Sequence, residues 1–337
     1  MQVLVTGVAG FIGAALAEAL LARGDEVIGI DNCNDYYAVS LKRARLSRLA
    51  EAGGDRFTFH EIDFADRDAL AAALAPHSFT HIAHLGAQAG VRYSIENPHA
   101  YVQSNLVGHV NLLEVARGQK DARGKAAHMV YASSSSVYGA NAKVPFAVED
   151  RVDHPVSLYA ATKKADELMS ETYAHLYRLP LTGLRFFTVY GPWGRPDMAL
   201  WIFTQKILAG QPIPVFNHGD MHRDFTYIDD IVAGVVAALD HPPADDGAAK
   251  AGGSVAPHAI YNIGNHRSEK LTSLIEAIEQ AAGRKAEVEL LPMQPGDVPR
   301  TFADIGAIQR DLGYAPTTSI AEGVPRFVEW YRGYHGV

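Results

Sequence analysis

The sequence lacks the features that define several large classes of protein. Its single cysteine, Cys33, excludes a disulfide framework and a cysteine zinc site. No apolar run reaches the ~18 residues that a membrane-spanning helix needs, and no signal peptide is evident, because Met1 and Gln2 lead straight into VLVTG. The net charge of -8 argues against nucleic acid as a general partner. These absences favour a cytoplasmic enzyme that acts neither on membranes nor on nucleic acid.

What is present is an ordinary globular composition, with 48% hydrophobic and 20% charged residues. The 337 residues exceed the usual size of one compact core, so we expect one large domain and a smaller one. The one cluster of positive charge, LKRARLSR at 41–48, is interpreted as a solvated helix face. The Ala-, Gly- and Pro-rich segment 241–259 predicts a mobile insertion, to which we assign no function.

The N-terminal segment carries a dinucleotide fingerprint. The β-branched run at 2–6 predicts a buried strand, and Gly7, Gly10 and Gly13 then open a helix that stops at Gly24. Such glycines let the backbone approach a pyrophosphate, and the helix N-terminus offers it free N–H groups. A second strand, EVIGID, ends at Asp31, whose carboxylate would accept hydrogen bonds from the adenosine ribose and repel a 2′-phosphate. The fingerprint therefore predicts a doubly wound parallel α/β sheet that binds NAD rather than NADP.

A second motif, YASSSSVYG followed by SLYAATKKADE, carries candidate catalytic groups. Tyr159 and Lys163 lie four residues apart in a segment without glycine or proline, so a helix would place them on one face. A buried ammonium beside a phenol stabilises the phenolate, which makes the phenol a usable base, and Ser134 would orient a substrate alcohol. A bare YxxxK is more often a surface pair of a helix. Its position after a dinucleotide fingerprint favours the catalytic interpretation.

The GxxGxxG spacing, the serine run and the YxxxK pair together resemble the extended short-chain dehydrogenase/reductase family, over nearly the whole chain. The resemblance implies a set of NAD-binding residues, with Gly86 at a place where alanine is usual. These residues are Gly7, Gly10, Phe11, Ile12, Gly13, Asp31, Asn32, Asn34, Asp63, Phe64, Leu85, Gly86, Ala87, Asn105, Ala132, Tyr159, Lys163 and Phe186.

The same resemblance implies that a nucleotide sugar binds where the strand–helix alternation becomes less regular, from about Tyr190. The implied substrate residues are Arg92, Ser134, Ser135, Ser136, Tyr159, Thr188, Arg195, Ala199, Val215, Phe216, Arg223, Gln294 and Asp297. Arg223 would hold the diphosphate bidentately, whereas Arg92 is equally well explained as a surface ion pair. We expect an NAD domain at 1–189 with a return segment at about 224–263, and a UDP-sugar domain at 190–223 and 264–337. The family also implies a homodimer through the long helices after the fourth and fifth strands.

The reaction follows from what surrounds the candidate base. NAD beside a Ser/Tyr/Lys set implies oxidation of a secondary alcohol. The family's dehydratases and decarboxylases carry acidic residues after the fifth strand, but SSSSVYG contains none. Such a site favours re-reduction of the same carbon from its other face, which is an epimerisation.

Substrate identity rests on longer strings. RFFTVYGPWGRPDMA and HPVSLYAATKKA resemble the UDP-glucuronate 4-epimerase branch of the family, which implies interconversion of UDP-glucuronate and UDP-galacturonate. A UDP-glucose 4-epimerase or a UDP-glucuronate decarboxylase remains an alternative, and a non-catalytic NAD-responsive regulator is a more distant one.

Overall fold

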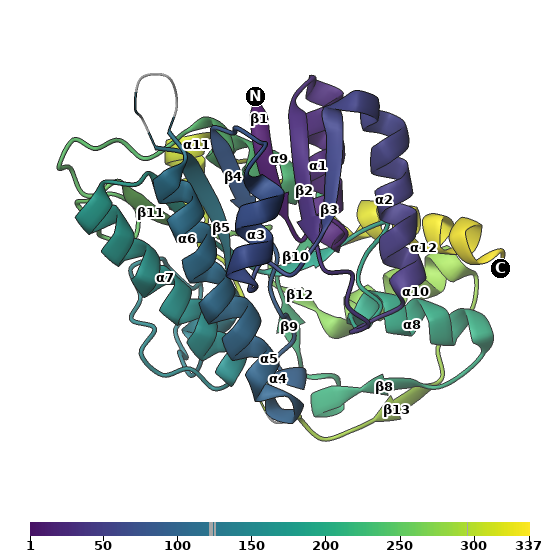
Figure 1. The fold of residues 1–337 in the computed structure, drawn as a ribbon. Coiled ribbons are helices and arrows are strands. Elements are labelled where there is room, and N and C mark those ends of the chain that lie inside the picture. Colours follow the sequence, from purple (N-terminus) through teal and green to yellow (C-terminus); the bar gives the residue numbers. More distant parts are fainter. Residues whose placement is uncertain (121–123, 125, 295) are drawn as a thin grey trace.

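The computed structural model describes residues 1–120, 124, 126–294 and 296–337, and is built around a seven-stranded parallel sheet (Figure 1). Its strands are β1 (Gln2–Thr6), β2 (Glu26–Asp31), β3 (Phe57–Glu61), β4 (His81–His84), β5 (His128–Ser134), β6 (Leu181–Phe186) and β11 (His258–Ile263). They follow the order β11-β6-β5-β4-β1-β2-β3, and every neighbouring pair is parallel. The expected doubly wound α/β class is confirmed.

The helices have the following bounds. They are α1 (Phe11–Arg23), α2 (Val39–Gly53), α3 (Arg67–Leu74), α4 (Tyr93–Glu96), α5 (Pro98–Tyr101), α6 (Gly108–Gly118), α7 (Leu158–Tyr177), α8 (Ala199–Ala209), α9 (Ile228–Asp240), α10 (Leu271–Ala282), α11 (Gly306–Leu312) and α12 (Ile320–His335). None of the helices in the described part of the chain is both long and apolar enough to cross a membrane.

Alternate residues of the strands feed two apolar layers, because successive side chains of a strand point to opposite faces. In β1, Val3 and Val5 belong to one core cluster with residues of α1 and α9. Leu4, between them, belongs to a second cluster with residues of α3, α6 and α7. The sheet is therefore covered by helices on both faces.

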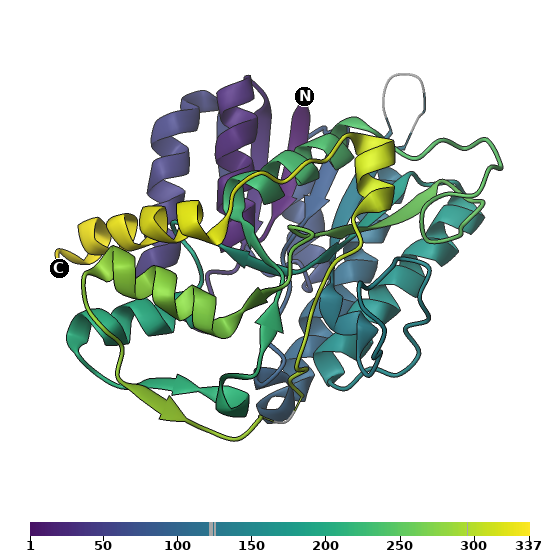
Figure 2. The ribbon, with the colours of Figure 1, turned by 180° about the vertical axis from the view of Figure 1, so that it is seen from behind.

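A smaller unit lies beside the sheet, where α8, α10 and α12 pack together (Figure 2). Short strand pairs surround these helices: β7 (Thr188–Tyr190) with β10 (Phe225–Tyr227), β9 (His222–Arg223) with β12 (Glu269–Lys270), and β8 (Ile213–Val215) with β13 (Val288–Leu290). The chain reaches this unit directly from the end of β6. Strand β11 later returns to the edge of the large sheet beside β6.

Local signals fix two of the helix boundaries. Helix α1 ends at Gly24, which adopts a left-handed conformation (φ 99°). Asp66 caps α3 by accepting hydrogen bonds from the N–H groups of Asp68 and Ala69. The helical stretch over residues 98–118 is not uniform, because Val102–Val107 form a π-helical turn between α5 and α6.

The interpretation of residues 41–48 as a solvated helix face is wrong for two of its charges. Lys42 and Arg45 are buried, and the Lys42 ammonium donates to Asn34 Oδ1 at 2.8 Å. The Arg45 guanidinium donates to the carbonyl oxygens of Ala9 (2.9 Å), Trp193 (2.6 Å) and Gly194 (3.0 Å). Helix α2 therefore turns part of its charged face inward, onto carbonyls that need donors.

The segment at 241–259 follows a defined course against α7. Arg178 and Asp245 form an ion pair, and Ser254 Oγ donates to Glu171 Oε1 at 2.9 Å. Ala251 and Ala256 are buried, and the last two residues of the segment begin β11.

Candidate active site

A cleft of 650 Å³ opens at the carboxyl ends of the sheet strands and extends beneath α8. It lies where β1 and β4 are neighbours and the chain leaves them towards opposite faces of the sheet, through α1 and α6. Ligands of doubly wound sheets bind at this kind of switch point.

The glycine loop at the start of α1 is shaped for a dinucleotide. Gly7 has φ of 69°, and a Cβ there would lie 2.7 Å from Gly86 Cα. A Cβ at Gly13 would lie 2.1 Å from the Gly7 carbonyl oxygen. No side chain caps the N-terminus of α1, so its N–H groups are available to a pyrophosphate.

Asp31 stands at the end of β2, where an adenosine ribose would lie. Its buried carboxylate accepts hydrogen bonds from the N–H groups of Ala9 (3.1 Å) and Cys33 (2.8 Å). Burial raises the pKa of Asp31, although these N–H groups and the Lys42 ammonium offset part of that rise. The residues present therefore fit NAD.

The end of β5 and the start of α7 bring the candidate catalytic groups to the same cleft. Ser134 is buried, and its hydroxyl oxygen accepts a hydrogen bond from the N–H of Ser136 (3.1 Å). This bond caps a 3-10 helix over Ser135–Tyr138. Ser157 caps the N-terminus of α7, which places Tyr159 in the first turn of the helix. Lys163 follows four residues later, on the same face of the helix. Ser134, Tyr159 and Lys163 all line the cleft.

Buried polar groups support this arrangement from behind. The Asn105 side chain accepts from the Gln88 N–H (2.9 Å) and donates to Thr162 Oγ1 (3.0 Å), which ties the loop after β4 to α7. Asn105 lies in the π-helical turn, and such turns often mark functional sites. Lys163 Nζ lies 3.1 Å from Asp166 Oδ2, and burial raises the pKa of Asp166 to about 6.

Most residues assigned from the sequence line this cleft. The lining residues from the cofactor set are Gly7, Gly10, Phe11, Ile12, Gly13, Asp31, Asn32, Asn34, Phe64, Leu85, Gly86, Ala87, Ala132, Tyr159, Lys163 and Phe186. Those from the substrate set are Arg92, Ser134, Ser135, Ser136, Thr188, Arg195, Ala199, Phe216, Arg223 and Asp297.

Four assigned residues are not part of the lining: Asp63, Asn105, Val215 and Gln294. Asp63 accepts a hydrogen bond from Asn32 Nδ2 at 3.3 Å, so it touches a lining residue. Val215 is buried within β8.

Arg92 forms an ion pair, as one of the two interpretations expected, and its contact with an anionic substrate stays a prediction. Its guanidinium pairs with Asp297 at 3.2 Å and lies over the Phe216 ring at 5.0 Å, and all three residues line the cleft. Arg223 lies in the same region, where burial lowers the pKa of its guanidinium although Asp297 acts against this.

The sequence analysis assigned Arg195 to the substrate site but missed its two partners in the cleft, Asp197 and Tyr36. Arg195 pairs with Asp197 (Nε–Oδ1 3.0 Å), and the Tyr36 hydroxyl donates to Asp197 Oδ2 at 3.2 Å. Burial raises the pKa of Tyr36 to about 12, so the hydroxyl stays a donor at neutral pH. Tyr36 and Asp197 lie 161 positions apart in the sequence, and no local pattern links the two.

A glycine loop, an acid after the second strand and a Ser/Tyr/Lys set at one switch point make up the cofactor and catalytic site of the extended short-chain dehydrogenase/reductases. Within that class, the model of the GDP-mannose 4,6 dehydratase family matches residues 4–327. The chain belongs to this family.

Relatives within the family are similar over the full chain. UDP-glucuronate 4-epimerase 4 of Arabidopsis thaliana is 51% identical over 99% of this chain and 76% of its own length. The probable UDP-glucuronate 4-epimerase of Rhizobium meliloti (strain 1021) is 48% identical over 98% of this chain and 97% of its own. A crystal structure of UDP-glucuronic acid 4-epimerase from Bacillus cereus with UDP-glucuronic acid and NAD superposes with a TM-score of 0.87, at 32% identity, over 99% of this chain and 100% of that one.

Proposed function

We propose that this protein is an NAD-dependent epimerase that interconverts UDP-glucuronate and UDP-galacturonate at C4 of the sugar. One observation carries the proposal: Ser134, Ser135, Ser136 and Thr188 face the cleft that holds Tyr159 and Lys163, and the segment from Ser133 to Gly139 has no acidic residue. The relatives of known or probable function, which share about half of the sequence, support the same substrate.

The residues divide the chemistry between them. When bound, NAD supplies hydride acceptance and return. Tyr159 takes the proton of the C4 hydroxyl, Ser134 orients that hydroxyl, and the Lys163 ammonium stabilises the phenolate. Because the segment from Ser133 to Gly139 contains no acidic residue, it supplies no second acid or base for elimination at a neighbouring carbon. Tyr159 therefore returns the proton to the same oxygen after the ketone has presented its other face.

The substrate carboxylate makes decarboxylation possible as a side reaction, and the hydroxyl groups are placed to prevent it. Oxidation at C4 makes the sugar a β-keto acid. If the C5–C6 bond aligns with the carbonyl π system, its electron pair forms an enolate, carbon dioxide leaves, and C5 then takes up a proton. We infer that the hydroxyl groups of Ser135, Ser136 and Thr188 hold the carboxylate out of that alignment by donating hydrogen bonds to it.

Replacing Ser135 or Thr188 by Ala is expected to raise the yield of UDP-4-keto-pentose relative to UDP-galacturonate. The variant would lose a donor that keeps the carboxylate in place, and each charged hydrogen bond is worth about 1.5–3 kcal/mol. Chromatography of the nucleotide sugars measures the ratio. Thr172→Ala, an exposed threonine of α7, is the matched control, and an unchanged ratio in both cleft variants would contradict the inference.

One assay tests the proposed function as a whole. The purified protein is incubated with UDP-glucuronate and the products are separated, with UDP-glucose in a parallel reaction. UDP-galacturonate as the main product supports the proposal. Conversion of UDP-glucose alone, or UDP-4-keto-pentose as the main wild-type product, would replace it by one of the alternatives within the family.

We also propose that the protein forms a homodimer through α6 and α7. These helices contact each other, and apolar side chains remain exposed on α7 at Leu168 (57%) and Leu176 (61%). Sedimentation velocity tests this, because Leu168→Glu should produce monomers if the face is an interface. A cytoplasmic location, supported by the single buried cysteine, stays part of the proposal.

A further inference from the structure

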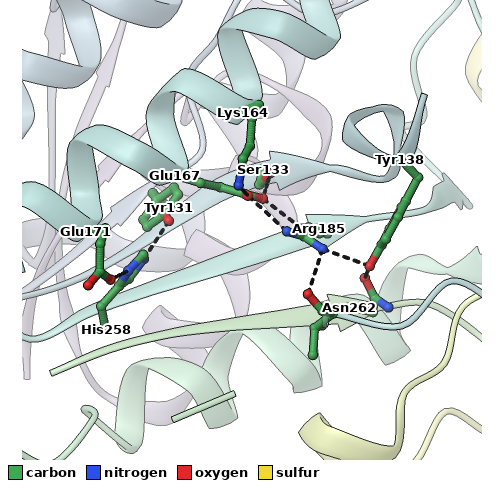
Figure 3. A network of polar contacts seen from close by, with 10 residues as sticks. Tyr131, Ser133, Tyr138, Lys164, Glu167, Glu171, Arg185, His258 and Asn262 are labelled. Atoms are coloured by element: carbon green, nitrogen blue, oxygen red, sulfur yellow. Dashed lines mark hydrogen bonds and ion pairs between the residues drawn. The ribbon is translucent and has the colours of Figure 1, made fainter. Parts of the chain in front are cut away.

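A buried ion pair lies directly behind the serine turn, by which we mean Ser133–Tyr138. Arg185 of β6 donates to Glu167 of α7 through two parallel hydrogen bonds, Nε to Oε1 at 2.8 Å and Nη2 to Oε2 at 3.0 Å (Figure 3). The two side chains are only 2% and 1% exposed. Burial alone would raise the pKa of Glu167, but the Arg185 guanidinium overcomes this and holds it below its usual value. The pair is therefore charged and geometrically fixed.

Both ends of the serine turn are attached to this one pair. At the first end, the Ser133 hydroxyl donates to Glu167 Oε1 at 2.7 Å. At the other end, Arg185 Nη1 donates to the Tyr138 hydroxyl at 3.0 Å. Figure 3 shows Ser133 and Tyr138 approaching the pair from two sides. Ser133 and Tyr138 are themselves buried, so neither bond competes with bulk water.

Each anchor is held in turn by other elements. The Tyr138 hydroxyl donates to Asn262 Oδ1 of β11 at 2.6 Å, and its ring stacks on Phe146. Glu167 also accepts from Lys164 Nζ at 3.1 Å. Glu167 lies one helical turn after Lys163, on the same face of α7. The pair therefore connects the serine turn to α7, the helix that carries Tyr159.

We infer that Glu167 and Arg185 are positioning residues that set where the hydroxyl groups of Ser134, Ser135 and Ser136 stand relative to Tyr159. They do so by fixing both ends of the serine turn, and they thereby decide whether the keto sugar keeps its carboxylate. The inference rests on the proposed function, because the serine hydroxyl groups are positioned relative to the C6 carboxylate of the proposed substrate. Tyr138, Glu167 and Arg185 are not among the cleft residues, so they act only through the serine turn, whereas Ser133 also lines the cleft.

The test removes each anchor without breaking the ion pair, because a lone buried charge would endanger folding. Ser133→Ala removes the hydroxyl at one end, and Tyr138→Phe removes the hydroxyl at the other. Ser170→Ala is the matched control, since Ser170 is an equally buried serine of α7 that contacts His109 (2.9 Å) instead of the pair. The readout is the ratio of UDP-4-keto-pentose to UDP-galacturonate per turnover, which does not depend on how much of the protein is folded.

We expect Ser133→Ala and Tyr138→Phe each to raise this ratio roughly three- to tenfold, because small displacements of positioning groups have large effects on reactive geometry. Ser170→Ala should keep the wild-type ratio. A wild-type ratio in either anchor variant, or an equal rise in the Ser170→Ala control, overturns the inference. A wild-type enzyme that forms no UDP-galacturonate overturns the proposed function, and the inference with it.

Discussion

Tyr159→Phe is expected to lower the turnover of UDP-glucuronate by about 10²- to 10⁴-fold, the usual contribution of a general acid/base group. The variant keeps the ring and removes the oxygen that takes the C4 proton. Tyr159 is half-buried in the first turn of α7. The Tyr101 ring lies beside it, 6.0 Å away between centroids, but cannot take over its role as base. The Tyr101 hydroxyl is committed to the carbonyl oxygen of Ala89 at 2.9 Å.

The control for this loss is a tyrosine of the same helix. Tyr173 donates its hydroxyl to Glu114 Oε1 at 2.6 Å and is not among the residues of the cleft. Tyr173→Phe should therefore keep wild-type turnover. Thermal melting and NAD content of both variants establish that they are folded. A Tyr159→Phe enzyme with near-normal turnover would remove this residue from the role of base.

The second large effect is on stability in acid, and it comes from two histidines behind Lys163. His84 and His109 are buried. Burial, together with the Lys163 ammonium, lowers the pKa of His84 to about 3. Burial and then the neighbouring His84 hold the pKa of His109 well below its ordinary value. Both rings are therefore neutral in the folded protein across the physiological range.

The sign of the pH dependence follows from the lowered values. Below about pH 6.5 such a histidine binds a proton in the unfolded state but not in the folded state, so protonation favours unfolding. Its contribution to stability is full above that pH and is lost as the pH falls towards the folded value. At about pH 5 each such histidine should cost about 2 kcal/mol of unfolding free energy.

His109→Phe tests this, because phenylalanine keeps a ring beside Tyr131 (5.1 Å between centroids) and cannot titrate. Denaturant unfolding at about pH 7.5 and about pH 5 should show a loss in the variant that is smaller than the wild-type loss by about 2 kcal/mol. Asp166 and Asp224, whose pKa values burial raises to about 6, act in the opposite direction. They are present in both proteins, so they cancel in the comparison.

His175→Phe is the control, since His175 is an exposed histidine of α7. It should lose as much stability in acid as the wild type. Equal losses in His109→Phe and the wild type would show that His109 takes up its proton without unfolding.

Much of the fold could be read from local patterns. The strand expected as EVIGID is β2, and the structure begins and ends it at those residues. Such strands are determined by short apolar runs with turn residues on either side, a signal that lies within a few consecutive residues of the sequence. The helix expected to carry Tyr159 and Lys163 on one face is α7, which begins at Leu158 after the cap at Ser157.

The contacts that position the site could not be read in this way. Arg45 looked like one of several surface charges, and its burial depends on carbonyl groups of Trp193 and Gly194, which the chain reaches only after the entire sheet. Arg185 stands in a buried strand, where a charge needs a partner, but nothing local identifies Glu167. The π-helical turn around Asn105 likewise adds no feature to the residue pattern of a long helix.

Arg45 also connects two segments of the chain that contribute residues to the cleft. One planar guanidinium donates to the carbonyl oxygen of Ala9 in the glycine loop and to the carbonyl oxygens of Trp193 and Gly194 in the segment that leads into α8. A lysine, with a single point of charge, could not span all three carbonyls in the same way. Loss of this one side chain would therefore loosen the glycine loop and the segment before α8 together.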